Sequence, residues 1–239
     1  MENWEQIEQD KRGTDTSPSE IQQSKNQIAY SKHEEQANIW SHFLGAVLAL
    51  VGAGVLLAKV LREGRESSQG LGLGALVVYV FCTVLMFAMS ALYHKMPYGS
   101  TRRVVFRRFD HCSIALLIAG TYAPFMVLGL GGTWGLVIEV IEIVLCVLIV
   151  TLNAVNVHKY RVVSIIAYVL MGWMCVLAVY PLAMKIGVRS LWVLGLGGLF
   201  YTGGIAFYKV KKIPFNHAIW HLCVLLGALC MWLSIYWFV

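Results

Sequence analysis

Charged side chains are scarce in this sequence of 239 residues: Asp, Glu, Lys and Arg make up 13%, against 58% hydrophobic residues. Together with a mean hydropathy of +0.67, this excludes an ordinary soluble domain and indicates an integral membrane protein. Cysteine is also uncommon, with six residues and no CxxC pair, which excludes a disulfide framework or a zinc knuckle. The acidic, polar start of the sequence is unlike a cleavable signal peptide.

Apolar runs of the length that spans a bilayer, about 20 residues, recur through the rest of the sequence. They predict an all-α integral membrane protein with a bundle of seven transmembrane helices in residues 34–239. Residues 1–33 are polar and lack apolar periodicity, so they are predicted to form a disordered cytoplasmic tail. The predicted spans are Ile39–Val60, Leu71–Tyr93, Phe109–Leu130, Trp134–Val155, Val163–Met184, Leu191–Tyr208 and His217–Val239.

The basic residues predict how the bundle is oriented. If the N-terminus lies in the cytoplasm, fourteen of the 19 Lys and Arg residues fall on the cytoplasmic side and five on the outer side. The excess of basic residues in cytoplasmic loops therefore predicts a multi-pass protein of the plasma membrane with its N-terminus inside and its C-terminus outside. Because the basic residues sit mainly at span ends, they indicate topology and contacts with anionic lipids, not nucleic-acid binding.

Histidines mark the cytoplasmic ends of two predicted spans. His217 and His221 are four residues apart on the last helix and therefore lie on one face, the spacing by which one helix offers two nitrogens to a metal ion. Ser90 and His94 have the same spacing at the end of the second span, at the same predicted depth. Three histidines from two helices fit a zinc site with an open fourth position. Alternatively, they are separate histidines at the membrane interface.

Two further polar groups are predicted at this depth. Glu35, Asn38 and His42 share one helical face, either as an ordinary polar cap or as a second shell around the site. Asp110 either pairs with neighbouring Arg107 or Arg108, or turns inward to hold a zinc-bound water and accept its proton. His111, one residue further on, is expected to point away from the site.

Polar and small residues also occur deep inside other spans. Glu139 and Glu142 could form a second polar site or proton path, or could pair with Lys185, Arg189 or water. Kinks are expected at Pro124 and Pro181. Close helix packing is expected at a set of glycines in the sixth span, namely Gly195, Gly197, Gly198, Gly203 and Gly204.

Taken together, three patches resemble the hemolysin III branch of the progestin and adipoQ receptor superfamily. They are Glu35-x-x-Asn38-x-x-x-His42, Ser90-x-x-x-His94 followed by Asp110, and His217-x-x-x-His221. The resemblance covers about residues 34–239 and implies a seven-helix bundle with a cytoplasmic N-terminus. It also implies zinc held by the three histidines, with Asp110 near the bound water and Ser90 lining the site.

The wider superfamily is similar to alkaline ceramidases, which suggests a zinc-dependent hydrolase acting on an amide or ester of a membrane lipid. Two other functions stay open at this point: a non-enzymatic receptor or regulator of membrane lipid state with structural zinc, and a cytolysin. Strongly apolar spans with few charged faces argue against a water-filled pore.

Overall fold

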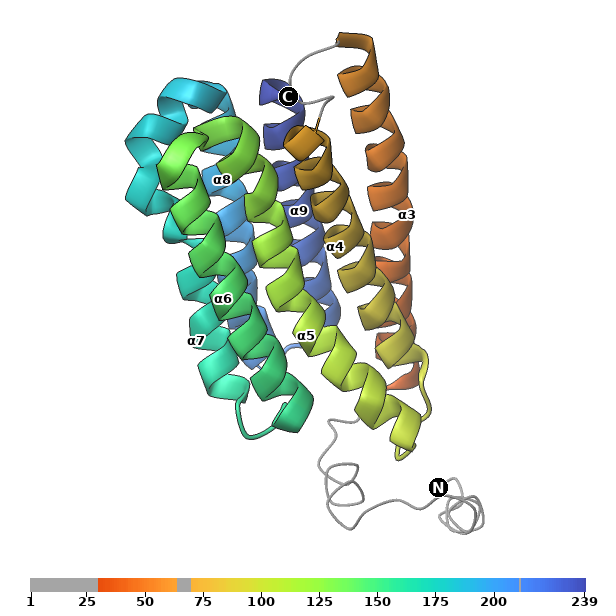
Figure 1. Ribbon diagram of the computed structural model, residues 1–239. Helices are drawn as coiled ribbons and strands as arrows, with labels where there is room; N and C mark the ends of the chain where they lie inside the picture. Colours follow the sequence, from red (N-terminus) through yellow and green to blue (C-terminus); the bar gives the residue numbers. More distant parts are fainter. Residues whose placement is uncertain (1–29, 64–69, 211) are drawn as a thin grey trace, which may run out of the picture.

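The computed structural model describes residues 30–63, 70–210 and 212–239, and nearly all of the predicted tail lies outside this range. All regular secondary structure in the described residues is helical (Figure 1). The first helix begins two residues before the predicted start of the membrane domain at residue 34 and seven before the predicted span. The α-helices are α3 (Lys32–Glu63), α4 (Gly70–Lys95), α5 (Thr101–Pro124), α6 (Gly132–Asn156), α7 (Arg161–Gly172), α8 (Val179–Lys209) and α9 (Asn216–Phe238).

Six helical stretches in the described residues are long and apolar enough to cross a membrane. Five of them correspond to single predicted spans. The fifth and sixth predicted spans share one stretch of 49 residues, Arg161–Lys209. This stretch is interrupted by the 3-10 segment Met174–Ala178 and by Gly187, whose φ of 82° and ψ of 152° are not helical. In Figure 1 the stretch runs along α7, turns, and returns along α8.

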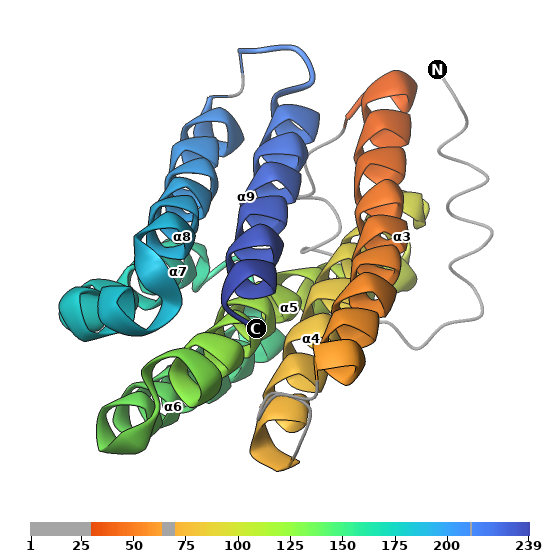
Figure 2. The same cartoon turned by 90° about the horizontal axis from the view of Figure 1, so that it is seen from above.

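Neighbouring helices pack around the bundle in an order visible from above (Figure 2). Helix α3 packs against α4 and α9, α4 against α5, α5 against α6, and α8 against α9. The close approach of α8 to α9 depends on glycine: a Cβ added at Gly204 would lie 2.7 Å from the Trp220 ring. The expected glycine packing is confirmed there and at Gly197, but is wrong at Gly195 and Gly203, where the surrounding space is open.

The two prolines behave differently from each other. Pro124 is the last residue of α5, and a π-helical segment, Phe125–Leu130, follows it directly, so the predicted distortion is present. Pro181 lies in the first turn of α8, where a missing N–H is tolerated. The predicted kink at Pro181 is therefore wrong, and the interruptions fall before it and at Gly187 instead.

Specific contacts fix where α9 begins. The Phe215 N–H donates to Glu34 Oε1 at 3.1 Å, which ties this point to the start of α3. The Asn216 side chain donates to the Phe207 carbonyl at 3.0 Å, which ties it to the end of α8. These bonds place the first turns of α9, with His217 and His221, at the same end of the bundle as the end of α4.

Candidate metal centre

Three histidines meet at this end of the bundle. His94 lies in the last turn of α4, and His217 and His221 lie in the first two turns of α9. One ring nitrogen of each lies within 4.8 Å of those of the others, so the cluster can hold a metal ion. The Nε2 atoms of His94 and His217 are 3.1 Å apart. Tetrahedral zinc, with Zn–N bonds of about 2.0–2.1 Å, separates its ligand nitrogens by about 3.3 Å. The described donor set therefore fits zinc.

Hydrogen bonds on the outer side of two rings orient them toward the cluster. His94 Nδ1–H donates to Glu35 Oε2 at 2.7 Å, which leaves Nε2 with its lone pair on the cluster side. His221 Nδ1 lies 3.2 Å from the Asn38 carbonyl and 3.0 Å from Ser41 Oγ. Because a carbonyl only accepts, His221 also presents Nε2. Metal-ligating histidines are commonly held in this way by a carboxylate or a carbonyl.

Glu35 is itself held by two groups that the sequence analysis did not single out. The Arg103 guanidinium and the Tyr98 hydroxyl both donate to Glu35 Oε1. Arg103 is 1% exposed, lies 3.8 Å from the Tyr98 ring centroid, and also donates to the Met96 carbonyl at 2.7 Å. Burial, and then the hydrogen bond to Glu35, raise the pKa of Tyr98, so its phenol stays a neutral donor. A buried Arg–Glu–His chain therefore runs into the histidine cluster.

Aromatic rings cover the cluster on two sides. His42 stacks on His221, with ring centroids 3.6 Å apart and an interplanar angle of 14°. Neither ring nitrogen of His42 has a hydrogen-bond partner in the described part of the chain. Tyr30 stacks on His217 at 5.2 Å, and its N–H donates to the Tyr98 hydroxyl at 2.7 Å. Tyr30 belongs to the segment predicted as tail, yet it lies against the site.

Asp110 and Ser90 lie beside the cluster on its inner side. Both are buried and line one cavity with His217 and His221. The described carboxylates contribute no fourth member to the histidine group, so Asp110 stands outside it. Its Oδ2 is 3.3 Å from His111 Nδ1. The expectation that His111 points away is wrong, because its ring turns back to Asp110.

Arg107 does not serve as the partner of Asp110 that the sequence suggested. Its guanidinium contacts His158 Nε2 at 2.7 Å. His158 lies between α6 and α7, and its pKa is lowered to about 4, first by burial and then by the Arg107 charge.

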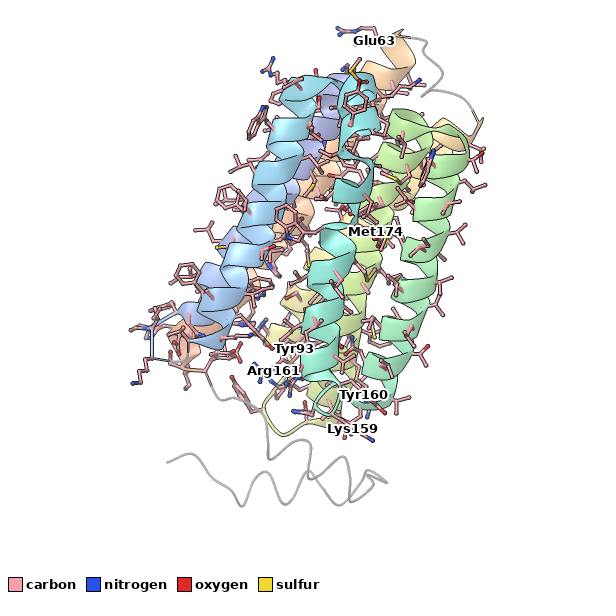
Figure 3. The ribbon with its side chains drawn as sticks, turned by 90° about the vertical axis from the view of Figure 1, so that its left-hand side faces the viewer. Glu63, Tyr93, Lys159, Tyr160, Arg161 and Met174 are labelled. Carbon is pink, nitrogen blue, oxygen red and sulfur yellow. The ribbon has the colours of Figure 1, made fainter. Side chains whose placement is uncertain are left out.

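The cavity has a volume of about 150 Å³ and a lining that is mostly apolar. It extends from the histidines to Met231, fourteen residues along α9, which is about 20 Å at 1.5 Å per residue. Most of its lining residues come from α5, α7, α8 and α9. Figure 3 labels Arg161, which lines the cavity at the start of α7, and Met174, at the interruption beyond it. The shape and lining suit a hydrocarbon chain.

Comparison with known proteins places this arrangement in a family. Residues 30–232 match the family described as "Haemolysin-III related". The chain belongs to this family. It is 32% identical to "Hemolysin-3" of Bacillus cereus over 206 residues, covering 86% of this chain and 92% of that protein. It is also 30% identical over 211 residues to "Monocyte to macrophage differentiation factor" of Homo sapiens, covering 82% of this chain and 80% of that protein.

A shorter match supports the wider resemblance to the adipoQ receptors. It is 29% identical to "Adiponectin receptor protein" of Drosophila melanogaster over 99 residues, 41% of this chain and 21% of that protein. Residues 30–232 include all the residues that the sequence analysis assigned to the site of this hemolysin III family member. Tyr98, in the short connection before α5, and Arg103, in the first turn of α5, were missed because a tyrosine and an arginine beside the end of a span carry no signal of burial. Ser41 and Tyr30 carried none either.

Proposed function

We propose that this hemolysin III family member is a zinc-dependent intramembrane hydrolase that cleaves an amide or ester bond of a membrane lipid. The observation that carries the proposal is the three-histidine cluster, two members of which, His217 and His221, line an apolar cavity, without a fourth described acidic, cysteine or histidine ligand. A metal bound by three protein nitrogens keeps one position for substrate or water, which is the arrangement of catalytic zinc sites. A site closed by four protein ligands would favour a purely structural metal.

Each residue around the cluster takes one role in this proposal. Bound zinc supplies a Lewis acid for the scissile carbonyl. Asp110 accepts the proton of the attacking water, and His111 lies against its carboxylate, with Nδ1 3.3 Å from Asp110 Oδ2 and 3.0 Å from the Arg107 carbonyl. Ser90 lines the cavity beside the reacting bond. Glu35, Asn38 and His42 form the shell that orients and covers the histidines.

The alternative is a receptor or regulator of membrane lipid state in which zinc clamps the bundle. It is favoured by the origin of the ligands, because one histidine comes from α4 and two come from α9. In that case the metal contributes folding energy, and no lipid is turned over. A cytolysin is the third possibility, and its support is the printed name of a relative, "Hemolysin-3" of Bacillus cereus.

The proposed topology has seven crossings, a cytoplasmic N-terminus and an outer C-terminus, in the plasma membrane. A straight helix of 49 residues would be about 74 Å long, far more than a hydrocarbon core of about 30 Å. With its interruptions, Arg161–Lys209 would instead cross twice. The metal centre would then face the cytoplasm. In intact cells, cysteines introduced in residues 98–101 should resist an impermeant thiol reagent, and cysteines in residues 131–133 should react. The reverse pattern would overturn the orientation.

Lipid turnover is the direct test of the hydrolase. Purified protein in vesicles made from a mixed lipid extract would be incubated with zinc or with a chelator, and lipid species would be followed by mass spectrometry. The proposal expects zinc-dependent loss of one lipid class with matching gain of a free fatty acid. Unchanged lipids with the zinc-loaded protein, beside a zinc-dependent rise in melting temperature, would favour the clamp.

A further inference from the structure

Two acidic residues lie inside helix α6, away from the metal centre. Glu139 and Glu142 are about one helical turn apart. Glu142 is 0% exposed, so protein covers it on all sides and it faces the bundle interior, not the lipid. It lies ten residues after the start of α6, or about 15 Å along the helix, which is about half of a 30 Å hydrocarbon core. This is the depth at which a charged side chain is most costly.

The carboxyl group of Glu142 has no hydrogen-bond partner in the described part of the chain. One oxygen of Glu139, Oε2, is likewise buried without a partner there. Within the described residues, neither Lys185 nor Arg189 forms an ion pair with Glu139 or Glu142. The Arg189 guanidinium instead lies over the Trp237 ring, 3.8 Å from its centroid. Since an ionised carboxylate left in this state is strongly unfavourable, Glu142 needs a bound cation, of which a proton is the smallest.

The surroundings of Glu142 include the interruption between α7 and α8. The Tyr122 hydroxyl accepts from the Cys175 N–H at 2.8 Å and donates to the Gly172 carbonyl at 3.3 Å. It therefore binds backbone groups that the interrupted helix releases around Met174, labelled in Figure 3. Interrupted helices at membrane depth bind ions in many transporters, and buried intramembrane carboxyl groups serve in proton relays.

Few titratable groups face Glu142 from the elements packed around it. Its electrostatic neighbours are Glu139 and Cys146 on α6, Tyr122 on α5, and Cys175 in the 3-10 segment. The π-helical segment Phe125–Leu130 contributes no titratable side chain. These groups include no permanent positive charge that would hold Glu142 as an ion pair.

We propose that Glu142 is a proton-binding site, separate from the metal centre, whose ionisation is coupled to the interrupted segment between α7 and α8. On release, the O–H bond of the carboxylic acid breaks, the proton passes to a water molecule, and Glu142 becomes a carboxylate. The new charge requires donors, and its electrostatic neighbours include Tyr122, whose hydroxyl binds the backbone at the interruption. Because Tyr122 and Cys175 also line the cavity, such a change would alter the far end of the cavity.

Infrared difference spectroscopy of the full-length protein in vesicles tests the proposal. A component of the C=O stretching band of protonated carboxyl groups should be present in the wild type, lost in Glu142→Gln, and retained in Glu139→Gln, the matched control one turn away. It should also disappear reversibly as the pH is raised. Asp110→Asn should leave it in place, which separates this site from the metal centre and from the proposed hydrolase.

Three results would overturn the proposal. A band that survives at every pH tolerated by the fold would make Glu142 an inert packing group. Identical spectra for the wild type and Glu142→Gln would place the proton elsewhere. Loss of the band on adding Na⁺ at constant pH would make it a metal-cation site. If Glu142→Gln does not fold, wild-type protein with isotopically labelled glutamate must show a labelled band that is lost at high pH, and its absence would also reject the proposal.

Discussion

Replacement of Arg103 by Met tests whether the buried chain behind His94 tunes the metal centre. The change removes the ion pair with Glu35, the hydrogen bond to the Met96 carbonyl, and the cation–π contact with Tyr98. Losing one partner of a buried pair costs about 3–5 kcal/mol. We expect the lower end of that range, about 3 kcal/mol, because Tyr98 and His94 still bond to Glu35. Loss of an outer partner of a metal ligand typically weakens metal binding 10- to 100-fold, or about 1.4–2.8 kcal/mol.

The assay is zinc competition against a chromophoric chelator in detergent, with thermal unfolding measured in excess chelator to isolate the metal-free fold. Arg102→Met is the matched control, since Arg102 is the exposed neighbour of buried Arg103. The zinc affinity of Arg103→Lys should fall between those of Arg103→Met and Arg102→Met, because lysine keeps the charge but lacks the two parallel donors of the guanidinium. Equal zinc affinity of the Arg103→Met and Arg102→Met proteins would refute the reasoning and leave Arg103 with a purely structural role.

Three further predictions concern single side chains. Asp110→Asn should keep zinc and most stability but lose about 10²- to 10⁴-fold in turnover, whereas full lipid turnover in that variant would remove Asp110 from the chemistry. His42→Ala should lower stability while zinc stays bound, as measured by metal analysis, and complete loss of zinc would make His42 a ligand. His158 should make the protein less stable as pH falls from about 6.5 towards about 4, since the unfolded chain takes up a proton that the folded one does not. Melting curves of His158→Gln should lose this pH dependence, and an unchanged profile would contradict the assignment.

The histidine cluster could be predicted from the sequence because its geometry is mostly local. His217 and His221 share a face by spacing alone, and the depth of His94 follows from the order of the spans. Arg103 could not be predicted in the same way. It is one of several arginines around the start of α5, and only the packed structure shows which of them turns inward.

The fold was predictable to a similar extent. Uninterrupted apolar runs predicted the spans well, but they carried no signal for the 3-10 segment Met174–Ala178, where the composition stays apolar. The non-helical conformation at Gly187, in contrast, falls within residues 185–190, which the sequence placed between the fifth and sixth spans. Such breaks depend on contacts with neighbouring helices, which a single segment of sequence does not contain.

If zinc binds as proposed, the ring of Tyr30 over His217 would affect how fast the metal exchanges. A covered cluster can have the same equilibrium affinity for zinc as an open one and still exchange zinc more slowly, because both entry and exit require the cover to move. The same residue is joined through its N–H to Tyr98 and from there to Glu35, so lifting it also breaks a bond in the chain behind His94. If the cluster binds zinc as proposed, the residence time of the metal would therefore be set at the point where the chain enters α3. A protein loaded once could keep its zinc long after the free metal around it has been depleted.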